Sequence, residues 1–137
     1  MGLGKTLQVI GLIHTLLSNK EMTKCEKILI LMPVNVLSNW VNEINKWTTK
    51  CKVKIEIHQL SGNSTNQRLD ALEDWDEFGG VFLMGYTMFA NLTHGSSIKE
   101  KKKADRFKEL LLSPGPDLVK KINIFCNFKI AVFEISK

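Results

Sequence analysis

The 137-residue chain is 44% hydrophobic and 24% charged, which is ordinary for a globular protein, and we expect one domain with a buried core. Its three cysteines are odd in number and widely spaced, so a disulfide framework and a paired zinc site are both disfavoured and a reducing intracellular setting is favoured. We expect neither secretion nor a membrane span, because no apolar run approaches about 20 residues and the first residues do not form a signal peptide. A net charge of +5 favours a polyanionic partner such as nucleic acid without requiring one.

The first predicted element is a helix that follows Gly4-Lys5-Thr6. Its apolar residues occupy nearly every side of a helical turn, so we expect the helix to be largely buried. These residues are Leu7, Val9, Ile10, Leu12, Ile13, Leu16 and Leu17.

Residues 28–32 form a continuous apolar run that ends at Pro33, which predicts an interior parallel strand with both faces covered. An amphipathic helix is predicted from Leu37, with Asn35 or Ser38 available to cap its start. Trp40 and Trp47 share the helical spacing of its apolar face, which favours core packing over base stacking for both.

Further along, Val53, Ile55 and Ile57 alternate with polar residues, which predicts a half-buried strand. A turn over residues 61–64 leads into a helix that stops at residues 79–80, both glycine.

The second half of the chain continues the alternation of strands and helices. Residues 81–84 predict another buried strand, residues 91–97 a polar loop, residues 98–112 a helix, and residues 113–117 the turn that ends it. The whole order predicts an α/β layered domain with a mostly parallel sheet.

Gly2-Leu3-Gly4-Lys5-Thr6 is the strongest chemical signal in the sequence. Glycines let backbone N–H groups approach phosphate oxygens, and the start of a helix adds a favourable dipole. In such a loop Lys5 contacts the β- and γ-phosphates of ATP, and the Thr6 hydroxyl binds Mg²⁺. A Gly-Lys-Thr tripeptide also occurs by chance at helix starts, so the tripeptide alone leaves nucleotide binding open.

Several segments together resemble a known family. Residues 1–10, MGLGKTLQVI, are similar to the first ATPase motif of Swi/Snf-type remodellers in helicase superfamily two, and residues 33–40, PVNVLSNW, look like the motif that follows. Residues 79–92 and 114–117 look most like the ATRX and androgen-receptor-interacting subgroup. The resemblance covers residues 1–119, and it implies part of the RecA-like first motor lobe with a phosphate-binding loop.

The resemblance implies a nuclear motor that binds ATP with Mg²⁺ and moves along double-stranded DNA to act on nucleosomes. Asn35, Ser38 and Asn39 match positions where family members approach the DNA backbone, and small polar side chains can donate to phosphates without reading sequence. Helix capping is the alternative role for these three residues. The lysines at 99 and 101–103 could also touch phosphates, although a solvated helix face explains them equally well.

Residues 120–137 depart from the family pattern. The family's acidic box of Asp-Glu-x-His type, which holds Mg²⁺ and orients the attacking water, is absent, and so is the second lobe with its arginine finger. We therefore expect no catalytic residues and no ATPase activity in this chain alone. We hypothesise that this tail is an unspliced intron or a gene-model boundary, in a fragment of a remodeller; the alternative is a short non-catalytic product that at most binds nucleotide, DNA or a partner weakly.

Overall fold

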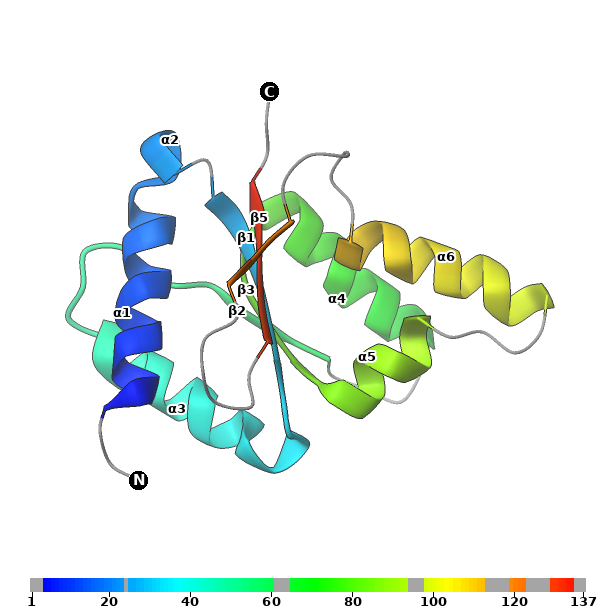
Figure 1. Cartoon of the computed structure of the whole chain (residues 1–137), viewed down its shortest axis with the longest axis horizontal. Coiled ribbons are helices and arrows are strands. Elements are labelled where there is room, and N and C mark those ends of the chain that lie inside the picture. Colours follow the sequence, from blue (N-terminus) through cyan, green and yellow to red (C-terminus); the bar gives the residue numbers. More distant parts are fainter. Residues whose placement is uncertain are drawn as a thin grey trace.

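A five-stranded sheet, with strand order β2-β3-β1-β5-β4, forms the centre of the protein in a computed structural model that describes residues 4–23, 25–60, 65–93, 98–112, 119–122 and 129–134 (Figure 1). The strands are β1 (Cys25–Met32), β2 (Ile57–Gln59), β3 (Gly80–Gly85), β4 (Val119–Ile122) and β5 (Lys129–Glu134). The helices are α1 (Lys5–Ser18), α2 (Lys20–Thr23), the 3-10 turn η1 (Val34–Val36), α3 (Leu37–Thr48), α4 (Thr65–Phe78), α5 (Tyr86–Thr93) and α6 (Ile98–Leu112).

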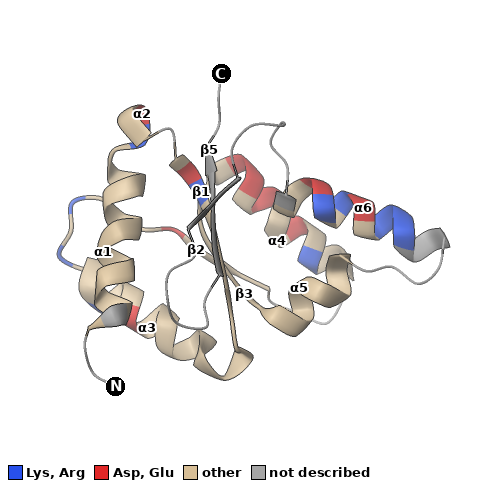
Figure 2. Ribbon diagram, in the orientation of Figure 1, with Lys and Arg blue, Asp and Glu red and all other residues tan. Residues whose placement is uncertain are grey.

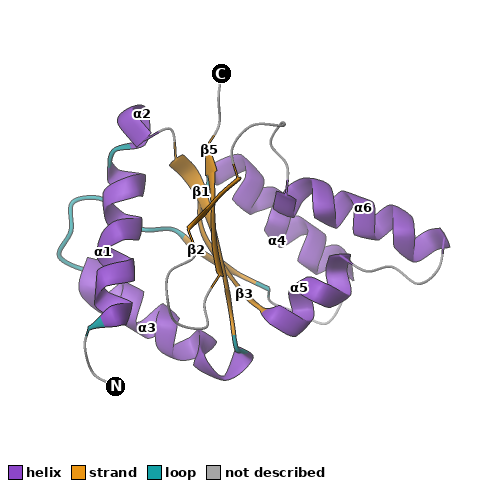
Figure 3. Ribbon diagram, viewed as in Figure 1, coloured by secondary structure: helices purple, strands orange, loops and turns teal. Residues whose placement is uncertain are grey.

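Strands β1, β2 and β3 are parallel to one another, and β3 lies between the other two. Helices connect these strands, as parallel strands require. Figure 3 shows the helices in purple and the strands in orange. The predicted α/β fold with parallel strands and flanking helices is therefore confirmed.

Helices cover both faces of the sheet, with α1 and α3 on one side and α4, α5 and α6 on the other (Figure 1). The burial of β1 explains the continuous apolar run over residues 28–32. Ile28, Ile30 and Met32 point into the core beneath α1 and α3, while Leu29 and Leu31 point into the core beneath α4 and α6. Residues 28–32, buried on both faces, are all apolar, so the interior strand predicted here is confirmed.

Helix α1 is less buried than its composition predicts. Val9, Ile10, Ile13 and Leu17 are buried against the sheet and α3. By contrast, the exposed fractions of Leu7 and Leu12 are 41% and 36%. The expectation of a largely buried helix is thus wrong for the side that faces away from the sheet, because only one layer of the protein packs on α1.

The two glycines predicted to end α4 do so with unusual backbone geometry. Gly79 and Gly80 have φ values of 76° and 96°. A Cβ atom on Gly80 would lie 2.6 Å from the carbonyl oxygen of Glu56. Only glycine lets the chain turn from α4 into β3 at this distance from the neighbouring backbone.

The strand predicted around residues 53–57 is shifted. Only Ile57–Gln59 pairs with β3, although the backbone N–H of Val81 also donates to the carbonyl oxygen of Glu56 at 2.8 Å. Val53 is 40% exposed and lies outside the strand. The start of the strand is set by its pairing with β3. The alternation of polar and apolar residues in the sequence gives no information about that pairing.

Two expectations about α3 are also wrong. Val36 is the N-cap and makes no side-chain cap bond, so neither Asn35 nor Ser38 caps the helix. Trp40 is buried as expected, but Trp47 is 43% exposed. The indole N–H of Trp47 donates to Glu43 at 2.7 Å, and the Lys46 ammonium lies 5.1 Å from the ring centroid, so this ring packs on its own helix instead of in the core.

Helix α6 has the predicted bounds, but part of the loop predicted before it is helical. Residues 91–93 form the last turn of α5, and the Thr93 hydroxyl donates to the carbonyl oxygen of Phe89 at 2.8 Å. The remainder of that loop and the turns predicted at 61–64 and 113–117 lie outside the described residues.

Strands β4 and β5 extend the sheet beyond β1. Strand β5 pairs antiparallel with β1, and β4 pairs antiparallel with β5. The sheet edge of β1 that β3 leaves free is thereby paired.

None of the described helices combines the length and the apolar composition that a membrane span requires.

Candidate functional site at the carboxyl ends of the parallel strands

The residues singled out by the sequence lie at one edge of the sheet. Strands β1 and β3 end there, at Met32 and Gly85, and continue into η1 and α5. Figure 1 shows the start of α1 at the same edge. In open α/β sheets ligands bind outside the carboxyl ends of the strands, so this edge is the candidate site.

Gly4 gives the start of α1 the geometry of an anion-binding helix terminus. Its φ and ψ are 66° and 19°, in the left-handed region, and it is the N-cap of α1 without a side-chain cap bond. No atom lies within 4 Å of a Cβ built on Gly4, so glycine is needed there for its backbone conformation. The Gln8 N–H donates to the Gly4 carbonyl oxygen at 2.9 Å, and the N–H groups before it are not capped by a side chain.

Of the other residues in the predicted phosphate-binding loop, the structure describes Lys5 and Thr6. Lys5 is the first residue of α1, and Thr6 is half-buried in its first turn. Gly2 and Leu3 lie outside the described residues. The first turn of α1 contains no acidic residue that would repel a phosphate.

A metal ion has few protein ligands at this edge. The Thr6 hydroxyl is one oxygen donor of the kind that Mg²⁺ accepts. Within the ranges that the structure describes, no group of three or more His, Cys, Asp or Glu side chains could hold a metal ion. The residues present thus fit the phosphates of a nucleotide better than they fit a complete metal site.

Asn35, Ser38 and Asn39 lie together on η1 and the first turn of α3, and all three are exposed. Neither element has a side-chain cap bond. Among the described residues, none of these three side chains has a hydrogen-bond partner within the protein. The capping role considered for them is therefore not observed, and their polar groups are free to meet a partner from solution.

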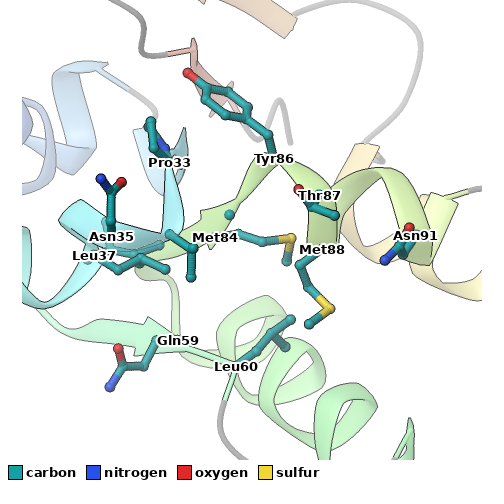
Figure 4. A pocket seen from close by; sticks show the side chains of 13 residues that line it. Pro33, Asn35, Leu37, Gln59, Leu60, Met84, Tyr86, Thr87, Met88 and Asn91 are labelled. Atoms are coloured by element: carbon teal, nitrogen blue, oxygen red, sulfur yellow. The ribbon is translucent and has the colours of Figure 1, made fainter.

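A pocket of about 670 Å³ opens between the ends of the three parallel strands (Figure 4). Its wall comes from the turn after β1, the end of β2, the end of β3 and the start of α5. The lining residues are Pro33, Val34, Asn35, Leu37, Gln59, Leu60, Leu83, Met84, Gly85, Tyr86, Thr87, Met88 and Asn91. Burial raises the pKa of the Tyr86 phenol above its ordinary value of 10.0.

Sequence reasoning gave no role to most of these pocket residues. Tyr86, Thr87 and Met88 follow directly after a buried strand that ends in glycine, which is the available signal for residues at the carboxyl edge of a sheet. That signal identifies the edge but not the cavity.

Helices α4 and α6, on the face of the sheet opposite α1 and α3, carry many charged residues (Figure 2). Arg106 on α6 binds Glu73 at 3.3 Å and Glu109 at 2.9 Å, and its hydrogen bonds to Glu109 and then Glu73 raise its pKa. The lysines at 101–103 are exposed and form none of the ion pairs found in the described part of the chain. They lie in the first half of α6, where the helix dipole does not favour cations, so a solvated face and an anionic partner both fit them.

Comparison with known proteins agrees with the resemblance found in the sequence. Residues 1–114 match the SNF2-related domain family. The chain is 39% identical over 127 residues to human "Transcriptional regulator ATRX", and 40% identical over 119 residues to "Protein CHROMATIN REMODELING 20" of Arabidopsis thaliana. It is 32% identical over 157 residues to "Helicase ARIP4" of Xenopus tropicalis.

These alignments cover 87% of this chain but only 5%, 8% and 11% of the three relatives. The chain therefore spans a small part of the length of the relatives that it matches. No solved structure matches it.

Proposed function

Because this chain belongs to the SNF2-related domain family, we propose that it is part of the first motor lobe of an ATP-dependent DNA translocase that acts on chromatin. The start of α1 carries this proposal. It combines a left-handed glycine, an uncapped helix terminus and the Gly-Lys-Thr sequence at the carboxyl edge of a parallel sheet.

Nucleotide binding is proposed for residues 2–6. The N–H groups at the start of α1 and the Lys5 ammonium supply positive charge for the phosphates of ATP, and Thr6 supplies one oxygen to the Mg²⁺ that accompanies them. Bound Mg²⁺ neutralises phosphate charge when it is present. We expect weak affinity from these 137 residues alone.

DNA binding is proposed for the turn after β1. The free polar groups of Asn35, Ser38 and Asn39 face solvent from a helix start, a geometry suited to donating hydrogen bonds to phosphate oxygens. Such contacts position a protein on DNA without reading its sequence, as a motor that moves along DNA requires. Double-stranded DNA and nucleosomes are therefore the proposed partners of the parent motor, in the nucleus.

Hydrolysis is not proposed for the 137 residues by themselves. They contain no Asp-Glu-x-His segment, and phosphoryl transfer depends on positioned charges around the metal, the attacking water and the leaving phosphate. Without those groups the chain acts at most as a weak binding module for nucleotide or DNA.

Phosphate release tests this division between binding and hydrolysis. Release from the wild-type chain with ATP, Mg²⁺ and duplex DNA should equal release from Lys5→Ala. DNA-stimulated release above the Lys5→Ala level would overturn the proposal that these residues do not hydrolyse ATP.

A further inference from the structure

In the described part of the chain, the pocket between η1, β2 and α5 is lined by residues without formal charge. The thirteen described residues that line it include no Lys, Arg, His, Asp or Glu, although the chain as a whole carries 19 basic and 14 acidic residues. Phosphate groups are held in proteins mainly by cations and by backbone N–H groups. The lining therefore suits a neutral molecule better than it suits a nucleotide or the backbone of DNA.

The interior of this pocket is apolar and its margin is polar. Figure 4 shows the side chains of Met84, Met88, Leu37 and Leu60 directed into the cavity, with Asn35, Gln59 and Asn91 around its margin. Apolar walls with a few polar groups at the rim are the usual composition of small-molecule sites. The three amides offer both donors and acceptors, so they can orient one polar edge of a ligand without requiring charge.

The volume of the pocket and the side chains of Met84 and Met88 indicate the class of ligand more closely. A volume of about 670 Å³ lies within the range of small-molecule pockets, far above the space that one water or ion needs. Thioether groups are polarisable and form favourable contacts with aromatic rings. Methionine side chains also adapt to differently shaped partners because they are unbranched.

We propose that this pocket is a binding site for an uncharged, mainly apolar aromatic molecule, separate from the phosphate-binding start of α1 and overlapping the proposed DNA contacts at Asn35. The site does not depend on nucleotide binding or on DNA binding. Its apolar interior comes from Leu37, Leu60, Met84 and Met88, and none of these residues is proposed to bind phosphate. A ligand seated there would lie beside Asn35, which the pocket shares with the proposed DNA contacts.

The neutral fluorophore N-phenyl-1-naphthylamine tests this proposal on the complete chain. Its emission should rise and saturate with the wild-type protein at one equivalent. Met88→Glu, which places a charge in the wall, should weaken binding by about tenfold or more because a carboxylate is costly beside an apolar ligand. Ala90→Glu adds the same charge to an exposed position of the same helix outside the pocket, and it should change affinity by no more than about twofold.

Methyl resonances of methionine locate the bound molecule in the wild-type protein, so the test survives any unfolding of Met88→Glu. The signals of Met84 and Met88 should shift on addition of the fluorophore. Those of Met22, which is 86% exposed, and Met32, which is fully buried elsewhere in the core, should not shift. Absence of saturable binding, equal loss in Ala90→Glu, or shifts at Met22 without shifts at Met84 and Met88 would each overturn the proposal.

Discussion

Lys27 on β1 forms an ion pair with Asp76 on α4, and this pair joins the central strand to a helix on one face of the sheet. The side chain of Lys27 is 7% exposed, whereas that of Asp76 is 44% exposed. The Lys27 ammonium also lies 5.9 Å from the ring centroid of Trp75, which is fully buried. A buried cation is thus held by one half-exposed carboxylate and one aromatic face.

The two halves of this pair should differ when each is removed. Asp76→Ala leaves the buried ammonium without its carboxylate and should lower the free energy of unfolding by about 1–3 kcal/mol. Lys27→Met removes the buried charge and keeps a long side chain, so it should cost less than about 1 kcal/mol. Urea unfolding of both variants measures the difference, and a larger loss in Lys27→Met would contradict this account.

Gly80 and Gly11 should respond in opposite directions to the same substitution. Gly80→Ala forces a side chain into a positive-φ position 2.6 Å from a backbone oxygen, so it should cost at least about 2 kcal/mol of unfolding free energy. Gly11 lies within α1 with open space around it, and Gly11→Ala should stabilise the protein by about 0.5–1 kcal/mol. Thermal unfolding followed by circular dichroism checks the two signs.

The proposed DNA contacts predict a loss of binding without a loss of stability. Replacing Asn35, Ser38 and Asn39 together by Ala should weaken binding to duplex DNA by about tenfold, since each lost hydrogen bond is worth about 1 kcal/mol or less. No charge is removed, so the slope of log affinity against log salt should stay unchanged. Fluorescence anisotropy at several salt concentrations measures both quantities.

Asn66→Ala is the matched control for this experiment, because Asn66 is an exposed asparagine on α4, across the sheet from α3. Its affinity for DNA should equal that of the wild-type chain. Unchanged affinity in the triple variant, or an equal loss in Asn66→Ala, would remove the support for a DNA-facing turn after β1.

Tyr86 makes the pocket wall accessible to a pH titration, because it is the one tyrosine in the sequence. Burial raises its pKa above 10.0, so the folded protein keeps the phenol proton at a pH where the unfolded chain has lost it. The stability that comes from this shift is fully present below about pH 10 and is lost as the pH rises through the folded pKa. Absorbance at 295 nm should show a midpoint above 10 in the folded protein and near the ordinary tyrosine value, about 10, in urea; equal midpoints would contradict the burial of this phenol.

The sequence pattern predicted the structure correctly where the environment of the residues is the same along a whole element or is fixed by backbone conformation. The apolar run of β1 and the glycines after α4 were predicted because burial on two faces and a positive φ each leave a direct mark on the sequence. Trp47 and Leu12 have the spacing of core residues but lie where no second layer covers them. Helical spacing indicates which side a residue is on and does not indicate how far the neighbouring element extends.

The candidate site was predictable only in part for a similar reason. Gly4, Lys5 and Thr6 are adjacent in the chain, so one motif indicates all three. The pocket joins residues 33–37, 59–60 and 83–91, which only the pairing of β1 and β2 with β3 brings together. No spacing within a single segment carries that information.

Backbone amide resonances tested with magnesium ATP give the most direct measurement of the proposed nucleotide site, and they detect weak binding. In the wild-type chain, and equally in a control in which the exposed Lys20 is replaced by Ala, the amides of Gly4, Lys5 and Thr6 should shift progressively with added nucleotide. In Lys5→Ala those shifts should be lost. No shift at the start of α1 in the wild-type chain, or shifts of the same size in Lys5→Ala, would contradict the account that this helix terminus binds the phosphates of ATP.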